Sequence, residues 1–375
     1  MGDEKNFITC RSKEQNPVNP LHAIVQGLYR TVLQERAADG FLNLVEKKKG
    51  SGMQTISVET ATDVSSLDGS LFSQFIVGGL PRLLSIPKVI HTQLGGCFDK
   101  RLAVAARPCD VRALVELAKR QQVAFGNLFI IGLECRGNVP ILDLLNALKK
   151  RGVDSSKIES CRMAETDVSA RISGGGELSL KIGKDIKLRE SCSRCNNRDP
   201  VVCDITISTL GRDGSADGVV FVRPETQRGK NCFELAEKQG LLIAASNLTS
   251  EESRRESIVK SLEKQATEKL TTDNSAFLKL GGSERFDQFR KMIEPCTKCG
   301  LCIRACPVCW CKDCILLKKI KTIDPMLLHL TRLDHMADTC VNCGKCDENC
   351  PKSIPLSRIY YGLATELSKI SGYRP

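Results

Sequence analysis

The sequence predicts an α/β domain followed by a small cysteine-rich domain. Apolar strand-like segments alternate with helical segments over the first two thirds of the chain. Cysteines concentrate near the end, where 11 of the 20 lie between Cys296 and Cys350. A chain of 375 residues is long enough for two or three domains. We therefore expect an α/β domain at 1–246, a charged helical connector at 247–292 and a cysteine-rich domain at 293–375.

Apolar periodicity places the regular elements of the α/β domain. The first are expected to be a helix at 21–38, strands at 41–45 and 55–58, and a helix at 71–86. A glycine-rich hairpin is expected at 170–182, and strands at 203–208 and 218–223 complete the domain. Residues 247–292 are charged and contain few β-branched residues, which favours a helical connector on the surface.

One βαβ unit matters for the chemistry. An apolar strand at 101–107 is followed by a helix at 111–122 and a second apolar strand at 128–134. Cys109 follows the first strand and Cys135 follows the second. Because the strands of a βαβ unit are parallel, both cysteines should lie at the same edge of the sheet.

Composition excludes several classes of protein. No run of apolar residues is long enough to span a membrane, and the polar N-terminal segment lacks a signal sequence, so we expect a cytoplasmic protein. The net charge of +11 counts every thiol as neutral, and metal-bound thiolates would bring it closer to zero. Aromatic residues make up only 5% of the chain. We therefore expect no nucleic-acid partner. Reduced cysteines in such numbers in a cytosolic protein indicate metal binding.

Two segments repeat the C-x2-C-x2-C-x3-C-P run of two-cluster ferredoxins, in which the fourth cysteine binds the other cluster. The first run begins at Cys296 and the second at Cys340. Crossed ligation predicts a first set of Cys296, Cys299, Cys302 and Cys350, and a second set of Cys306, Cys340, Cys343 and Cys346. Gly300 and Gly344 suit a backbone that wraps closely around each cluster. Zinc needs only paired C-x-x-C units and leaves the third cysteine and the proline of each run unexplained.

Other cysteines leave alternatives open. Cys309, Cys311 and Cys314 could give three ligands to a fourth cluster or pack as small buried residues. Cys192 and Cys195 could form half of a zinc knuckle with Cys203. We prefer the alternative in which they join Cys109 and Cys135 in a third set of four thiolates, because it explains why both strand-end loops contain a cysteine. Buried, inert thiols are expected at Cys10, Cys97, Cys161, Cys203 and Cys232, and structural roles at His329 and His335.

These motifs together resemble a known family. The segments Arg107-Pro-Cys-Asp110, Gly132-Leu-Glu-Cys135 and Cys192-Ser-Arg-Cys195 are similar to those of the beta subunits of deazaflavin-dependent (coenzyme F420) hydrogenases and formate dehydrogenases. The C-terminal cysteine runs make the order of domains most similar to that of the formate dehydrogenase beta subunit. The resemblance implies a 4Fe–4S cluster on the third set, with FAD bound beside it in the α/β domain.

The sequence departs from the family at the flavin pocket. The family has a double glycine near the first helix, where this chain reads Asn19-Pro20-Leu21-His22-Ala23, and the later flavin-contacting stretch is only partly kept at 68–72. Two functions are therefore carried forward. The first is an electron-transfer subunit with three or four 4Fe–4S clusters, serving a formate dehydrogenase or hydrogenase catalytic subunit or heterodisulfide reductase-like subunits. The second is a flavoprotein that exchanges hydride with deazaflavin or NAD(P)H through FAD.

Overall fold

A computed structural model describes residues 7–13, 20–48, 54–62, 85–154, 157–212, 218–244 and 249–375. Its largest element is a mixed eight-stranded sheet. The strands are β1 (Ile8–Ser12), β2 (Gly40–Lys48), β3 (Gln54–Ala61), β4 (Leu102–Ala106), β5 (Leu128–Leu133), β9 (Ile205–Ser208), β10 (Val219–Pro224) and β11 (Leu242–Ala244). Their order across the sheet is β11-β1-β10-β9-β5-β4-β2-β3. The predicted α/β fold with a mixed sheet is confirmed.

The predicted βαβ unit forms the middle of this sheet. Strands β4 and β5 are parallel, with Leu102 opposite Leu128, and helix α3 (Pro108–Lys119) connects them. The neighbouring pairs β2–β4 and β5–β9 are also parallel, whereas the outer pairs are antiparallel. The carboxyl ends of β4 and β5 therefore open at one edge, directly before Cys109 and Cys135.

Helices cover both faces of the sheet, which explains its continuous apolar strands. Ala103 and Ala105 of β4 pack in one core with α1 (Pro20–Gln34) and α6 (Gln227–Lys238). Leu102 and Val104 pack on the opposite face with α2 (Ile86–Thr92) and α3. Side chains alternate between the two faces of a strand, so a strand covered on both sides must be apolar at every position.

Helix α1 ends at Gln34, four residues before the end of the predicted helix. The predicted strands at 41–45 and 55–58 lie within β2 and β3, and those at 203–208 and 218–223 contain β9 and most of β10. Most of the predicted helix at 71–86 lies outside the described residues. The 3-10 turn η3 (Gly95–Cys97) precedes the βαβ unit, and η4 (Phe125–Asn127) lies within it, between α3 and β5.

A second, three-stranded sheet forms beside the first. It consists of β6 (Ile158–Met163), β7 (Asp167–Ile172) and β8 (Gly176–Lys181), all antiparallel. The predicted glycine-rich hairpin is β7–β8. Val168, Ala170 and Leu180 face a core shared with α4 (Ile141–Lys150). The chain then returns through the short helix α5 (Glu190–Ser193), which carries Cys192.

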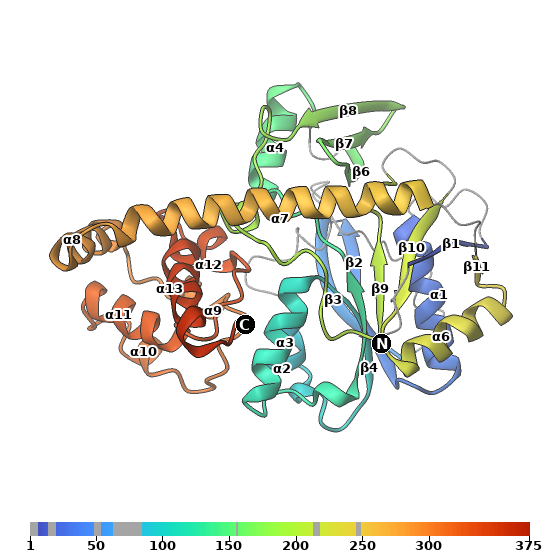
Figure 1. The fold of residues 1–375 in the computed structure, drawn as a ribbon, viewed down its shortest axis with the longest axis horizontal. Helices are drawn as coiled ribbons and strands as arrows, with labels where there is room; N and C mark the ends of the chain where they lie inside the picture. Colours follow the sequence, from blue (N-terminus) through green and yellow to red (C-terminus); the bar gives the residue numbers. More distant parts are fainter. Residues whose placement is uncertain are drawn as a thin grey trace.

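The charged segment forms one long helix, α7 (Thr249–Leu278), followed by α8 (Gly282–Ile293). Figure 1 shows α7 crossing over both the large sheet and the C-terminal helices. One side of α7 is buried, including Ile258, Ala266 and Leu270. Arg255 of α7 forms a buried ion pair with Glu134 at the end of β5, with Nε 2.9 Å from Oε2. Its guanidinium also lies 3.8 Å from the centroid of the Phe7 ring.

The C-terminal part is built from short helices around the cysteine runs. These are α9 (Leu301–Arg304), α10 (Ile315–Lys318), α11 (Pro325–Met336), α12 (Lys345–Glu348) and α13 (Leu356–Ser371). Figure 1 shows these helices beside α2 and α3 of the α/β part. Polar contacts join the two parts: Lys88 Nζ donates to the Cys309 carbonyl oxygen at 2.9 Å, and Arg189 pairs with Glu348 at 2.6 Å.

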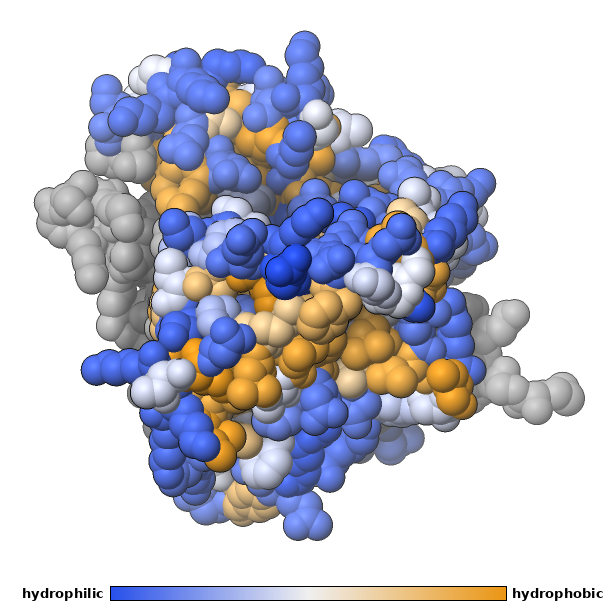
Figure 2. Space-filling view, turned by 90° about the vertical axis from the view of Figure 1, so that its left-hand side faces the viewer, coloured by the Kyte–Doolittle hydropathy of each residue, from blue (hydrophilic) through white to orange (hydrophobic). Residues whose placement is uncertain are grey.

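The outer face of the C-terminal helices exposes apolar side chains. Phe286 of α8, Ile315 of α10 and Leu327 of α11 are each at least half exposed. Figure 2 shows an apolar band across this face, bordered by hydrophilic residues. In the described part of the chain, no helix is long and apolar enough to cross a membrane.

The Arg255–Glu134 pair gives a test of how α7 is held on the sheet. We expect Arg255→Met to lower the free energy of unfolding by about 3–5 kcal/mol, because it leaves the Glu134 carboxylate buried without its partner. Urea denaturation under anaerobic conditions measures this. The matched double variant Glu134→Leu/Arg255→Met should recover most of the loss, since removing both charges leaves none uncompensated. A single variant as stable as the wild type would contradict the account.

Candidate functional site

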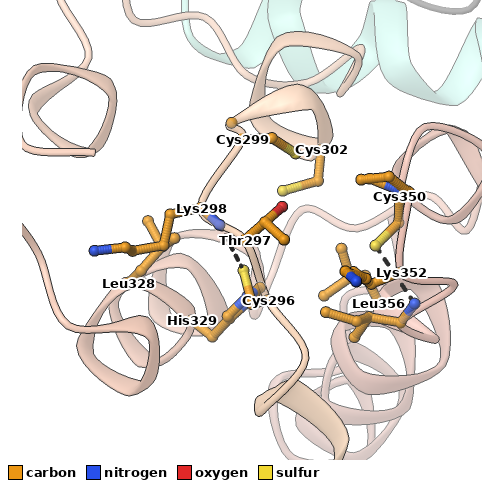
Figure 3. Close-up of a pocket in the computed structure, with 13 residues that line it drawn as sticks. Cys296, Thr297, Lys298, Cys299, Cys302, Leu328, His329, Cys350, Lys352 and Leu356 are labelled. Atoms are coloured by element: carbon orange, nitrogen blue, oxygen red, sulfur yellow. Dashed lines mark hydrogen bonds between the residues drawn. The ribbon is translucent and has the colours of Figure 1, made fainter. Parts of the chain in front are cut away.

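The first set of cysteines lines one pocket. Cys296, Cys299 and Cys302 come from the first run, and Cys350 comes from the second. Figure 3 shows the four side chains around a common space, with His329 of α11 beside them. His329 is buried, its Nδ1 lies 3.2 Å from the Tyr360 hydroxyl, and its Nε2 is buried without a hydrogen-bond partner among the described residues.

The second set lines a neighbouring pocket. Cys340, Cys343 and Cys346 of the second run meet Cys306 of the first run there. The two runs thus exchange their fourth cysteines in space. This is the grouping that crossed ligation requires, and it arises because α9 packs against α12.

The two runs share an unusual backbone. Lys298 and Asn342 precede the second cysteine of each run, with φ of 54° and 55°. Gly300 and Gly344 follow that cysteine, with φ of 70° and 72°. These left-handed positions turn the chain around the pocket and direct backbone N–H groups inward, so that Lys298 N lies 3.4 Å from Cys296 Sγ. N–H groups that point at the sulfurs are a means of tuning an iron–sulfur site.

The donor set fits a cluster better than a single ion. Burial raises the pKa of Cys340 to about 12, so a thiolate here needs a cationic centre beside it. Among the described residues, no three His, Cys, Asp or Glu side chains converge closely enough to hold one metal ion. A structural zinc site requires four ligands at about 2.0–2.3 Å from one atom. Sulfurs spread around a pocket suit the larger 4Fe–4S core.

The third set gathers at the edge of the large sheet. Cys109 lies in the first turn of α3, Cys135 follows β5, and Cys192 and Cys195 lie in and after α5. Burial raises the pKa of Cys109 to about 12, and the nearby thiols of Cys135 and Cys195 add to this rise. Burial also raises the pKa of Cys135, with Cys192 the next contributor. Cys109 is thus near Cys135 and Cys195, and Cys135 is near Cys192. The sheet topology predicted the first of these neighbours, the common edge of Cys109 and Cys135.

Gly137 shapes the third set in the way that Gly300 and Gly344 shape the runs. Its φ is 112°, and its N–H lies 3.4 Å from Cys135 Sγ. A Cβ at this position would lie 3.3 Å from both Cys192 Cβ and Arg198 Nη1. Glycine thus permits the close approach of the two loops that carry Cys135 and Cys192.

The second and third sets are neighbours. Asn342 Nδ2 donates to the Ser191 carbonyl oxygen at 2.8 Å, which joins the second run to α5. Burial raises the pKa of Cys343 well above its ordinary value, and Cys306 and Cys109 contribute next to that rise. Because Cys109 belongs to the third set, the sets form a row, with the second in the middle.

The three surplus cysteines differ in their surroundings. A hydrogen bond from the Cys309 thiol lowers the pKa of Cys306, so Cys309 lies against the second set, and it also packs with Cys314 against one apolar cluster. Cys311 is exposed, and Cys314 packs with Ile303, Leu316 and Leu328 near the first set. Binding of a fourth cluster by these three cysteines therefore stays a prediction.

The remaining cysteines have the surroundings of packing residues. Cys10 and Cys232 lie in the core under α1, Cys97 and Cys203 lie in the core under α3, and Cys161 packs against the smaller core of β6–β8. Burial raises the pKa of Cys232 and Cys203 to about 12 and that of Cys97 to about 11. Such thiols stay protonated and inert.

Buried arginines are the feature that sequence reasoning missed. Six arginines near the cysteine sets are at most 6% exposed: Arg107, Arg112, Arg189, Arg194, Arg198 and Arg332. Arginine is seldom buried without a compensating negative charge. Arg107 lies inside a cysteine motif, Arg107-Pro-Cys-Asp110, whereas nothing in the sequence around Arg332 indicates that it is buried.

Only some of the residues at the family's flavin pocket lie in the described part of this chain. Helix α1 begins at Pro20, so it starts within the segment where the family has its double glycine. Residues 68–72 lie outside the described part of the chain.

Known proteins match this chain in sequence and fold. Residues 99–249 match the family described as the C terminus of the coenzyme F420 hydrogenase/dehydrogenase beta subunit. The beta subunit of F420-dependent formate dehydrogenase from Methanocaldococcus jannaschii is 28% identical, over 94% of this chain and 90% of that protein. The beta subunit of F420-dependent formate dehydrogenase 1 from Methanococcus maripaludis is 29% identical, over 94% of this chain and 89% of that protein.

A solved structure has the same fold. A chain of the F420-reducing NiFe hydrogenase complex from Methanosarcina barkeri matches with a TM-score of 0.56 and 14% identity. The match covers 73% of this chain and 96% of that chain. It shows the α/β fold. The family match over residues 99–249 and the two formate dehydrogenase relatives support the resemblance to the beta subunits of coenzyme F420-dependent hydrogenases and formate dehydrogenases.

Proposed function

We propose that this chain is an iron–sulfur electron-transfer subunit of a multi-subunit redox complex of the formate dehydrogenase or heterodisulfide reductase type. The observation that carries the proposal is the row of three four-cysteine sets through one chain. Two sets line neighbouring pockets, and the third lies beside the second at the edge of the sheet. The relatives are named as subunits of F420-dependent formate dehydrogenases, which supports a role within a complex.

Each set would hold one 4Fe–4S cluster, which accepts and releases one electron at a time. The chain supplies thiolates, backbone N–H groups directed at sulfur, and burial. Lys298 N and Gly137 N lie 3.4 Å from Cys296 Sγ and Cys135 Sγ. Burial excludes water from the second set, where Cys306 and Cys346 are each 8% exposed. These are the factors by which a protein sets the potential of a cluster.

One end of the relay opens at the surface. Cys299 of the first set is exposed, whereas the second set lies between the first and the third. Electrons would therefore enter or leave through the first set, at the end of the molecule formed by the C-terminal helices. Oxidation of formate would take place on a separate metal-bearing subunit.

The flavoprotein function remains the second candidate. The observation that favours it is the F420 dependence named for both formate dehydrogenase relatives. FAD would lie in the α/β part beside the third set and would exchange hydride with deazaflavin or NAD(P)H. Absorbance of flavin released by acid from the purified protein separates the two candidates.

The crossed grouping predicts which cluster each fourth cysteine serves. We expect Cys306→Ala to damage the cluster of Cys340, Cys343 and Cys346, because Cys306 lines their pocket. The matched variant Cys350→Ala should instead damage the cluster of the first set. EPR spectra of the reduced variants report which signal is lost. Loss of the first-set signal in Cys306→Ala would contradict crossed ligation.

The third set predicts a cluster independent of the two runs. Cys109→Ala and Cys192→Ala should each remove one EPR signal and about four irons, while both ferredoxin-type signals persist. Cys203→Ala is the matched control, because Cys203 lies in the apolar core and should leave the iron content unchanged. Full iron and unchanged spectra in both test variants would remove this cluster from the relay.

The iron content also tests the three surplus cysteines. We expect a Cys309→Ala/Cys311→Ala/Cys314→Ala variant to keep the iron of the wild type, because Cys311 is exposed and Cys309 bonds to Cys306. If the three residues hold a fourth cluster, the variant will instead contain about four fewer irons per chain. Iron and acid-labile sulfide analysis of anaerobically purified protein measures the difference.

A further inference from the structure

We propose that two buried arginines, Arg332 and Arg112, set the potentials of the relay by placing one fixed positive charge in each gap between neighbouring cysteine sets. Arg332 lies between the first and second sets, and Arg112 lies between the second and third. The inference rests on the proposed function, since it concerns clusters held by those sets.

Arg332 bonds to the first ferredoxin-type run and lines the pocket of the second set. It belongs to α11 and is 2% exposed. Its Nη2 donates to the Cys302 carbonyl oxygen at 2.8 Å, while its side chain lines the pocket of the second set. Its Nη1 lies 3.9 Å from Cys309 Sγ, and the guanidinium carbon lies 5.3 Å from the centroid of the Tyr360 ring. The guanidinium is thus fixed between the two pockets.

Arg112 has the equivalent place on the other side of the second set. It lies on α3, one turn after Cys109, and is 6% exposed. Its Nη2 donates to the Val341 carbonyl oxygen at 2.7 Å, inside the second run, and its Nη1 donates to the main-chain oxygen of Pro375 at 2.8 Å. The backbone of Arg112 therefore lies on the helix that carries Cys109 of the third set, and its guanidinium contacts the second run.

Neither arginine pairs with an acidic side chain. Among the described residues, no Asp or Glu lies within ion-pair distance of Arg332 or Arg112, and the Nε atom of each is buried without a hydrogen-bond partner. A buried charge with no compensation is strongly destabilising. A 4Fe–4S core with four thiolates carries about two negative charges, so clusters on both sides of each arginine would supply compensation that acidic side chains do not.

The sign of the effect follows from charge alone. A fixed positive charge beside a cluster favours the reduced cluster, which carries one more negative charge than the oxidised cluster. Each arginine should therefore raise the potentials of the two clusters that it separates.

Neutral variants test the inference in the full-length, cluster-loaded chain. Arg332→Met and Arg332→Gln should lower the potentials of the first-set and second-set clusters and leave the third unchanged. Arg112→Met and Arg112→Gln should lower those of the second and third and leave the first unchanged. We expect the reduced-to-oxidised ratio at a fixed potential to fall about tenfold, which is 59 mV for one electron. EPR-monitored redox titration measures all three clusters, with signals assigned by the cysteine variants.

Two controls separate charge from structure. Arg332→Lys and Arg112→Lys keep the charge and should restore most of each shift. Arg212→Met removes another buried arginine, one whose charge is paired with Glu251, and should move no potential. We expect the potential of the second-set cluster to change when either arginine is neutralised. The potentials of the first-set and third-set clusters should each change with one arginine only.

Three results would overturn the inference. Potentials that stay unchanged in the neutral variants would remove the electrostatic role. Equal shifts of all three clusters in every variant would indicate a general effect of mutation. Loss of iron in both neutral variants of one arginine would make that residue structural. A wild-type protein without 4Fe–4S signals would instead contradict the proposed function itself, so the two failures are distinguishable.

Discussion

The fit between Gly344 and Ser191 is the contact on which the arrangement of the cysteine sets depends. Gly344 has a φ of 72°, and a Cβ added to it would lie 2.1 Å from Ser191 Oγ. Such a distance is far inside van der Waals contact, and Ser191 Cβ would lie at 2.9 Å, so a residue with a Cβ would have to displace Ser191. Because Cys343 precedes Gly344 and Cys192 follows Ser191, this close approach brings the second and third sets beside each other. The hydrogen bond from Asn342 to the Ser191 carbonyl oxygen acts at the same place.

Buried charge is the second constraint. Thiols in an apolar interior favour their protonated form, and arginines in the same interior need a negative partner. The structure places six nearly inaccessible arginines around the cysteine sets. Three of the six pair with carboxylates, namely Arg107, Arg189 and Arg194. For Arg332 and Arg112, the clusters of the proposed function would supply the negative charge, and arginine remains protonated at every relevant pH.

Local sequence patterns were sufficient to predict the features that depend on residues close together in the chain. The apolar runs of β4 and β5, with α3 between them, predicted the parallel pair and the common edge for Cys109 and Cys135. The glycines at 300 and 344 suggested a backbone that wraps closely around each pocket, and the structure gives both a left-handed φ. Features that depend on distant residues were not predicted. Strand β1 pairs with β10 and β11, more than 200 residues away, so its short sequence carried little signal. Arg332 and Arg112 look like ordinary helix residues until the fold buries them.

The central claim is that three clusters form one continuous relay within this chain. Spin quantitation by EPR on the fully reduced, anaerobically purified protein tests it most directly. The account predicts about three unpaired-electron centres of the 4Fe–4S type per chain, together with about twelve irons and twelve labile sulfides. Zinc in place of iron, or only two centres that survive in every variant of the third set, would contradict it.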